Sequence, residues 1–407
     1  MTSFGLTAAQ RDFAAQVRGY AAAELRPLAE DGQPGHVNRE LLAAMGRLGL
    51  LARLFPGAAA GEPSREASAM DLCLLRESLA TQSTDAETAL ALQGLGSYPV
   101  LQSGADEQVR RWLPAVAAGT AVAAFALSEP GAGSDAAALE LAALPDRGGW
   151  RLTGVKTWIS NAPEADFYTV FARTTPGAGA RGVSAFLVPA DRPGLSGTHL
   201  DMVSPHPIGT LAFDGVPVYR DELLGEPDRG FAVAMKTLNL FRPSVGAFAV
   251  GMAQAALDAA CEHAASRIVF GGPLKDQQAV AHLLAEMATR TEAARLLVYS
   301  AATALDEGAS GPAGGRERSS GAGKTEPGRS AMAKLFATET AQFVVDSAVQ
   351  IHGARALERG HLLEHLYREV RAPRIYEGAS EIQRTIIARE LLRGSFSGPA
   401  SGAPGQR

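Results

Sequence analysis

The sequence contains little of what several protein classes require. Its 407 residues include only two cysteines, Cys73 and Cys261, so neither a disulfide framework nor a cysteine metal site is expected, and a reducing cytoplasm fits. The formal net charge of −5 argues against nucleic acid, which is bound through basic surfaces. The N-terminal residues lack the basic start and apolar run that are typical of a signal peptide. We also expect no apolar segment to be long enough to span a bilayer. These observations predict a soluble cytoplasmic protein with no membrane or nucleic-acid partner.

Residue types that build a core are plentiful. With 46% hydrophobic and 20% charged residues, the chain can bury a large core divided over roughly two or three domains. Apolar residues recur at helical spacing from residue 6 to about 119 and again from 230 to 392, whereas short β-branched and aromatic runs occupy 121–231. The sequence predicts an α+β fold, mostly α, with an N-terminal helical domain (1–120), a middle β domain (121–232) and a C-terminal helical domain (233–394).

The β domain is predicted in some detail. We expect strands at 150–159, 167–172, 183–188 and 210–218, and a hairpin turn at Asp146–Gly149. Two stretches have too few apolar residues to fold into a core. Residues 308–330 predict a flexible loop inside the C-terminal domain, and residues 395–407 predict a disordered tail.

One carboxylate stands in a turn just before the last predicted helix. Ser380 and Gln383 have the spacing of a capping box, so Glu377 is expected outside the regular helix, next to the permissive Gly378. An apolar ligand lying against this carboxylate would raise its pKa toward that of a general base. The alternative is an acidic residue that the helix dipole stabilises. The turn by itself does not decide between them.

Two short motifs suggest other chemistry and are rejected. Gly323-Lys324-Thr325 resembles the end of a phosphate-binding loop, but Arg318 occupies the position of the first glycine and no strand precedes it. His361 and His365 have the H-x-x-E-H spacing of some zinc peptidases, yet a third ligand is not apparent. We predict no metal site from these motifs.

Several motifs in order carry a family resemblance. They are Phe4–Arg11, Ala124–Asp135, Lys156–Ala162, Arg267–Leu274 with Gln278, Gln350–Gly353 and Tyr376–Gly378. In sequence and spacing, residues 4 to about 394 resemble the acyl-CoA dehydrogenase family of flavoproteins. The resemblance implies FAD as cofactor, a β-barrel or sheet as the middle domain and a four-helix bundle as the C-terminal domain. It also implies an electron-transfer flavoprotein, or another electron acceptor, as partner.

The resemblance assigns Glu377 the role of catalytic base. It would take the proton from the α-carbon of an acyl thioester while flavin N5 accepts the hydride from the β-carbon. In the family, the backbone amide of this glutamate and a flavin hydroxyl bind the thioester carbonyl. Relatives with the base on the central helix carry glutamate where this chain has Phe241, which leaves Glu377 as the candidate.

Cofactor contacts follow from the resemblance by position. Phe125, Leu127 and Ser128 match contacts to the pyrimidine side of the flavin, and Trp158 and Ser160 match residues beside the ring. Other matches reach the diphosphate and adenosine from a neighbouring subunit, which implies a homo-oligomer, a dimer or tetramer: Arg267, Phe270, Gln278, Gln350 and Gly353. Ser134, Ala379 and Glu381 are also expected at the cofactor. Ala379 replaces the usual threonine, so one hydroxyl contact to the flavin is expected to be lost.

Substrate contacts are matched in the same way. The positions expected near the acyl-CoA are Ser134, Asn239, Phe241, Arg242, Gly378 and Arg389. Three functions remain open at this point. The first is FAD-dependent dehydrogenation of acyl-CoA, the second is the same chemistry on an acyl or aminoacyl group carried by a carrier protein, and the third is a flavin oxidase or monooxygenase.

Overall fold

The N-terminal region is helical in the computed structural model, which describes residues 5–58, 62–309 and 326–392. Its helices are α1 (Ala8–Tyr20), α2 (Arg26–Glu30), α3 (Arg39–Arg47), α4 (Ala69–Ala80), α5 (Thr84–Ser103) and α6 (Asp106–Ala117). Side-chain caps fix several of the helix starts, because each supplies an acceptor to an otherwise unpaired N–H. The hydroxyls of Thr7, Ser68 and Ser83 cap α1, α4 and α5 in this way.

A curled sheet of seven strands follows. The strands are β1 (Ala123–Ala126), β2 (Ala142–Asp146), β3 (Gly149–Ser160), β4 (Phe167–Arg173), β5 (Val183–Pro189), β6 (Leu195–His199) and β7 (Ile208–Tyr219). They pair in the order β1-β4-β2-β3-β7-β6, and β5 pairs with β4. The predicted strands are present, and Asp146 and Gly149 close the β2–β3 hairpin as expected. Sequence analysis missed β1, β2 and β6, because alanine-rich β1 and polar edge strand β6 lack β-branched runs.

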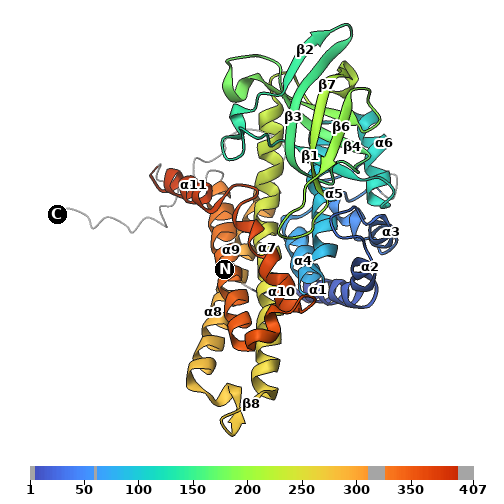
Figure 1. Ribbon diagram of the computed structural model, residues 1–407. Coiled ribbons are helices and arrows are strands. Elements are labelled where there is room, and N and C mark those ends of the chain that lie inside the picture. Colours follow the sequence, from blue (N-terminus) through green and yellow to red (C-terminus); the bar gives the residue numbers. More distant parts are fainter. Residues whose placement is uncertain (1–4, 59–61, 310–325, 393–407) are drawn as a thin grey trace, which may run out of the picture.

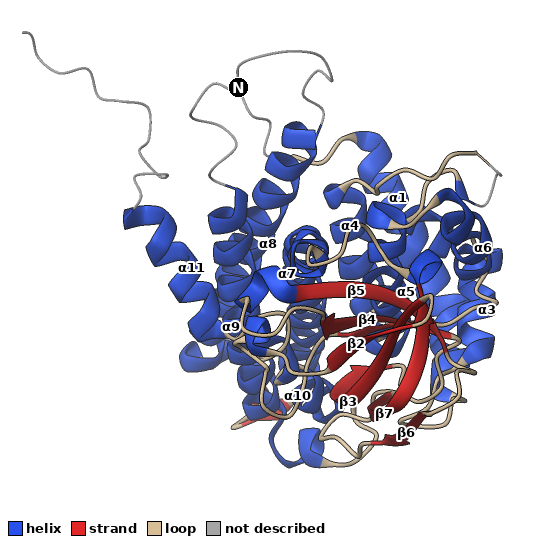
Figure 2. Ribbon diagram, turned by 90° about the horizontal axis from the view of Figure 1, so that it is seen from above, coloured by secondary structure: helices blue, strands red, loops and turns tan. Residues whose placement is uncertain are grey.

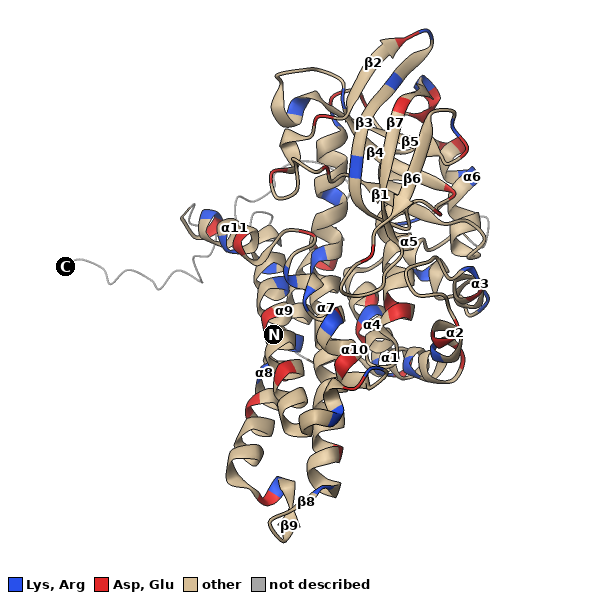
Figure 3. Cartoon of the chain, in the orientation of Figure 1, with Lys and Arg blue, Asp and Glu red and all other residues tan. Residues whose placement is uncertain are grey.

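The C-terminal region is a helical bundle, and this fold is the predicted α+β, mostly α, class. Its helices are α7 (Gly230–Ser266), α8 (Gln278–Ala309), α9 (Glu326–His352), α10 (Leu362–Glu369) and α11 (Ser380–Leu392). A small hairpin, β8 (Ile268–Val269) with β9 (Gly272–Pro273), joins α7 to α8 at the end of the bundle far from the large sheet (Figure 1). Helix α7 lies between the sheet and helices α8 and α9 (Figure 2). Acidic and basic residues occur in all three regions (Figure 3).

Helix α7 corrects one expectation. At 37 residues, with an 18-residue window of mean hydropathy 1.3, it is long and apolar enough to cross a bilayer, so the prediction that no segment reaches this length was wrong. However, 78% of that window is buried within the protein. Gly251 shows how closely α7 packs, because an added Cβ would lie 2.6 Å from the Glu77 carbonyl oxygen of α4. Its apolar surface is therefore that of a core helix.

The predicted loop at 308–330 is shorter than expected. Helix α8 continues to Ala309 and α9 begins at Glu326, so both ends of the predicted loop are helical. The remainder, with the Gly323-Lys324-Thr325 motif, lies outside the described residues, as does the tail at 395–407. His361 and His365 have separate roles at α10. His361 caps the helix through its Nδ1, which accepts from the Leu363 N–H, and His365 contacts Thr84.

A buried ion pair connects the sheet to α10. His206 Nε2, in the loop before β7, lies 2.9 Å from Glu369 Oε2, and Glu369 is only 1% exposed. Burial works to lower the pKa of His206, but Glu369, Asp85 and Glu87 together raise it to about 8. Burial works to raise the pKa of Glu369, but the charges of His206, His365 and Arg368, with the hydrogen bond to His206, together lower that pKa. The pair therefore stabilises the junction most while His206 is protonated.

This pair predicts a pH-dependent stability. Because the folded-state pKa of His206 is about 8 and the ordinary value is 6.5, its contribution is fully present below pH 6.5 and is lost as the pH rises through 8. We expect His206→Gln to lower the free energy of unfolding by roughly 2 kcal/mol near pH ~6, where His206 is protonated and Glu369 is ionised, and by much less above pH ~9. Denaturant unfolding of both proteins across this range measures the difference. A cost that does not change with pH would contradict the assignment.

Candidate active site

Glu377 lies in a turn with an unusual backbone between α10 and α11. Its φ is 51°, in the left-handed region, and Gly378 follows with a φ of 95°. For a non-glycine residue this conformation is strained and persists only where the surroundings hold it. Lys334, fully buried in α9, donates to the carbonyl oxygens of Tyr376 at 3.0 Å and Gly378 at 2.7 Å. One ammonium thus fixes the backbone on both sides of Glu377.

Helix α11 begins where the sequence predicts, but the predicted capping box is absent from it. Ser380 is already helical, so the capping position falls on Ala379. The Ser380 hydroxyl donates to Glu339 Oε1 at 2.7 Å, and Arg374 also pairs with Glu339. The Gln383 amide turns back and donates to the Gly378 carbonyl oxygen at 2.8 Å. Both side chains therefore tie the turn to its surroundings rather than capping the helix.

The electrostatics around Glu377 favour a carboxylate with a raised pKa. The side chain is half-buried, and its Oε2 is buried without a hydrogen-bond partner among the described residues. Burial raises the pKa of Glu377, while the positive charges of Arg76, Lys334 and Arg242 oppose the rise. The net direction is upward, and atoms of the protein cause this burial without the apolar ligand that the sequence-based expectation invoked. Burial lowers the pKa of Lys334 to about 8.

Helix α7 supplies the other polar groups beside the turn. Arg242 is 7% exposed, donates to Asn239 Oδ1 at 2.6 Å and approaches the Glu377 carbonyl oxygen at 3.5 Å. The structure therefore brings Asn239 and Arg242 together with Glu377. Phe241, predicted beside the substrate, is 1% exposed and packs edge-on against Tyr98 with ring centroids 5.2 Å apart. Its ring lies in the core between α7 and α5.

A second buried lysine joins two segments that sequence analysis assigns to the flavin. Lys156 of β3 is fully buried and donates to the Leu127 carbonyl oxygen at 2.9 Å and to Glu129 Oε1 at 2.7 Å. Glu129 also accepts from the backbone N–H groups of Glu140 and Leu141. The Thr157 N–H donates to the Ser128 carbonyl oxygen at 3.1 Å. Positions 125–128 and 158–160 therefore lie side by side.

The surface that these segments form suits a flat, hydrogen-bonding ring. Trp158 has a φ of 55° and is 49% exposed. Ser128 and Ser160 are half-buried, and their hydroxyls make no hydrogen bond within the described part of the chain. Phe125 is half-buried against Phe171, with ring centroids 4.9 Å apart. An open aromatic face next to hydroxyls with free hydrogen-bonding capacity fits an isoalloxazine.

Other predicted cofactor contacts lie far from this surface within the chain. They are exposed and gather around the β8–β9 hairpin and the end of α9: Arg267, Phe270, Gln278, Gln350 and Gly353. Phe270 is 97% exposed with a φ of 51°, and His352 stacks on His263, which brings the two segments together. The hairpin lies at the end of the bundle away from the sheet that carries Trp158, so this group and the Trp158 surface are separated within one chain (Figure 1).

The remaining predicted contacts are spread out. Leu127 is buried and Ser134 is exposed on the loop after β1. Ala379 is half-buried next to Glu377, and Glu381 is exposed at the start of α11. Arg389 is exposed in the last turn of α11, roughly 14 Å along the helix from Ser380. The structure does not bring Arg389 to the turn.

Sequence analysis did not predict the contacts of the residues that hold this site together. These are Lys334 and Gln383 at the turn, Lys156 and Glu129 under the ring surface, and Arg76, the strongest opposing charge near Glu377. A usable signal was present for the lysines. Each stands on the apolar face of a predicted element, where an unpaired charge is too costly to bury.

Comparisons with known proteins identify the fold family. Residues 7–120, 124–216 and 228–392 match, in turn, the family models of the N-terminal, middle and C-terminal domains of acyl-CoA dehydrogenase. The chain is 37% identical over 386 residues to the mitochondrial short-chain specific acyl-CoA dehydrogenase of Bos taurus, covering 92% of this chain and 88% of the relative.

Solved structures agree. The butyryl-CoA dehydrogenase of Megasphaera elsdenii superposes with a TM-score of 0.86 at 31% identity, covering 96% of this chain and all of that one. PigA, solved with FAD and proline, gives a TM-score of 0.87 at 26% identity and covers 97% of this chain and all of its own. The chain belongs to the acyl-CoA dehydrogenase family.

Proposed function

We propose that this protein is an FAD-dependent dehydrogenase that introduces an α,β double bond into an acyl-CoA thioester, with Glu377 as the base. The observation that carries the proposal is the Glu377 carboxylate, held in a strained turn with one oxygen buried and unpaired. A buried carboxylate that lacks a partner is destabilised as an anion, which makes it a stronger base than one in water.

The reaction divides between the chain and its cofactor. Glu377 removes the proton from the substrate α-carbon, and the electron pair of that C–H bond forms the new double bond. When bound, FAD supplies the two-electron acceptor for the hydride that leaves the β-carbon. The amide of Glu377 is proposed to hydrogen-bond the thioester carbonyl, on which negative charge develops as the proton leaves. Lys334 and Arg242 donate to backbone carbonyl oxygens of residues 376–378 and so hold the turn that carries this amide and the carboxylate.

FAD is proposed to lie across two copies of the chain. Phe125, Ser128, Trp158 and Ser160 would hold its ring, and the exposed group around Arg267 would reach its diphosphate from a second copy. Arginine suits this task because its planar fork binds two phosphate oxygens at once. The separation of the two groups within one chain supports a homo-oligomer, a dimer or tetramer.

The electron acceptor and an alternative substrate are proposed separately. An electron-transfer flavoprotein is proposed as the electron acceptor, following the family. The second candidate substrate is an acyl or aminoacyl group on a carrier protein, as the family resemblance allows, and the likeness to PigA, solved with FAD and proline, favours the aminoacyl form.

A panel of thioesters tests the proposal. We expect anaerobic addition of an acyl-CoA to bleach the flavin absorbance of the purified protein, because the hydride reduces the flavin. Acyl and aminoacyl groups on a carrier protein form the second arm, and bleaching by these alone would replace CoA with a carrier protein. Peroxide formation in air at the rate of substrate oxidation, with no added acceptor, would instead indicate an oxidase.

A further inference from the structure

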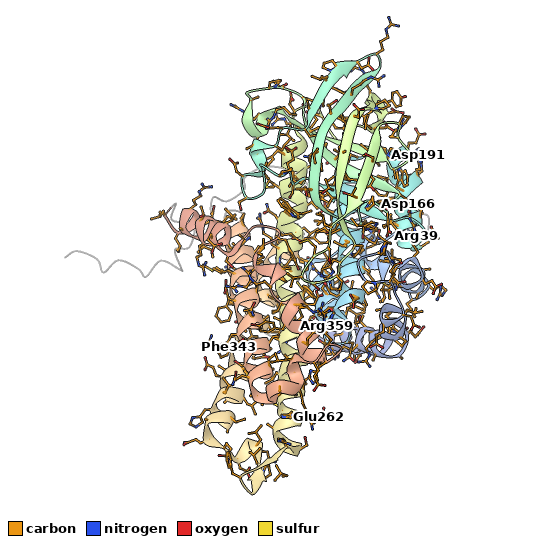
Figure 4. All side chains as sticks on the ribbon, in the orientation of Figure 1. Arg39, Asp166, Asp191, Glu262, Phe343 and Arg359 are labelled. Carbon is orange, nitrogen blue, oxygen red and sulfur yellow. The ribbon has the colours of Figure 1, made fainter. Side chains whose placement is uncertain are left out.

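A second cluster of ionisable side chains lies outside the active site, where the N-terminal helices meet the sheet. His36 stands in the turn between α2 and α3, Glu164 in the turn between β3 and β4, and His199 at the end of β6. Arg39 and Asp166, labelled in Figure 4, mark the same junction and form an ion pair of 2.9 Å. Three segments that are distant in sequence thus converge on one point.

The two imidazoles both approach one oxygen of the Glu164 carboxylate. His36 Nδ1 lies 2.6 Å from Glu164 Oε1, and His199 Nε2 lies 3.5 Å from the same atom. The centroids of the two imidazole rings lie 4.4 Å apart, and the ring planes are tilted by 49°. One nitrogen or oxygen from each residue falls within 4.8 Å of the other two. The side chains are 30–38% exposed, so an ion from solvent can reach them.

The carboxylate is held in place by its neighbours. Glu164 Oε2 accepts the Val37 N–H at 2.6 Å, which fixes the plane of the group and leaves Oε1 toward the imidazoles. Arg39 donates to the Glu164 carbonyl oxygen and to Asp166, so an aspartate balances its positive charge. Such outer hydrogen bonds are typical of metal sites, where they orient the ligands.

We propose that His36, Glu164 and His199 bind one Zn²⁺ ion. Two imidazole nitrogens and a carboxylate oxygen are ligands that Zn²⁺ prefers, and three protein ligands leave a fourth position for water. Ligands at about 2.0–2.2 Å from tetrahedral Zn²⁺ are roughly 3.3–3.5 Å apart. His199 Nε2 already has this spacing from Glu164 Oε1, and His36 Nδ1 reaches it by moving back by less than about 1 Å.

The site has a structural consequence. Because its ligands come from the α2–α3 turn, the β3–β4 turn and β6, a bound ion ties the N-terminal helices to the sheet. His36 also lines a cavity of about 420 Å³, shared with Asn38, Asn161 and His206, which gives the ion access to water. The ion is therefore a link between domains and takes no part in the proposed dehydrogenation.

Zinc titration of the flavin-loaded enzyme tests the proposal. After removal of metals with a chelator, we expect calorimetry to detect one Zn²⁺ per chain and the unfolding temperature to rise with Zn²⁺ concentration, because binding favours the folded state. His199→Ala and Glu164→Gln should each weaken binding by at least about tenfold, since even partners of ligands are worth about 10–100-fold.

The control removes a carboxylate from outside the cluster. Glu286→Gln, the match for Glu164→Gln, removes an exposed carboxylate paired with Arg290 on α8 and should leave Zn²⁺ affinity unchanged. Absence of saturable binding, equal affinity in His199→Ala and wild type, or a loss confined to Glu286→Gln would each overturn the proposal. Flavin content and unfolding temperature without metal show that each variant is folded. The readouts are independent of catalysis, so the inference and the proposed function fail separately.

Discussion

Glu377→Gln is expected to keep its flavin and to lose substrate oxidation by roughly 10²–10⁴-fold or more, the usual contribution of a general base. The amide has almost the same shape as the carboxylate, so the strained turn and the contacts of Lys334 with the carbonyls on either side are preserved. The glutamine amide cannot accept the proton from the substrate α-carbon, so the reaction lacks its base. The rate of anaerobic flavin reduction by an acyl-CoA measures the effect directly.

Two further variants make this result decisive. Glu377→Asp keeps a base but withdraws it by one methylene, and we expect an intermediate rate. Glu286→Gln removes an exposed carboxylate paired with Arg290 on α8, and its rate should equal that of wild type. Full activity in Glu377→Gln would remove the assigned base and with it the proposed mechanism.

Lys334→Met is expected to give the second largest loss, roughly 100-fold in kcat, because a base displaced by about 1 Å costs about that much. The substitution removes both hydrogen bonds that hold the turn on either side of Glu377. It also removes a positive charge that opposes the rise in the pKa of Glu377. The pKa of Glu377 therefore rises further, and the acid limb of the profile of kcat/KM against pH moves to higher pH.

The pH profile separates these two roles of Lys334. In Lys334→Gln an amide donor remains without the charge, so kcat should recover in part while the acid limb stays displaced. Lys236→Met, which removes an exposed lysine paired with Glu66, is the matched control and should change neither quantity. An acid limb identical to that of wild type in both Lys334 variants would show that the lysine has no electrostatic role at the base.

Local patterns were enough to predict the elements around the site. The apolar spacing of the C-terminal region and the turn residues before Ser380 predicted where α11 begins and that Glu377 lies outside it. The capping contact was wrong, because Glu339 on the distant α9 offers the Ser380 hydroxyl a stronger, charged partner. The alanine-rich strand β1 was missed for a similar reason, since its pairing with β4 and not its own composition makes it a strand.

The sequence by itself determined the succession of helices, strands and helices, the position of Glu377 in a turn and the order of the family motifs, because each depends on residues that are close along the chain. Only the tertiary structure decided what surrounds that carboxylate. Lys334, Arg242 and Arg76 come from α9, α7 and α4, and His36, Glu164 and His199 meet from three separate segments. Packing of the helices and the sheet sets these distances, and the strength of charge interactions depends on distance and burial.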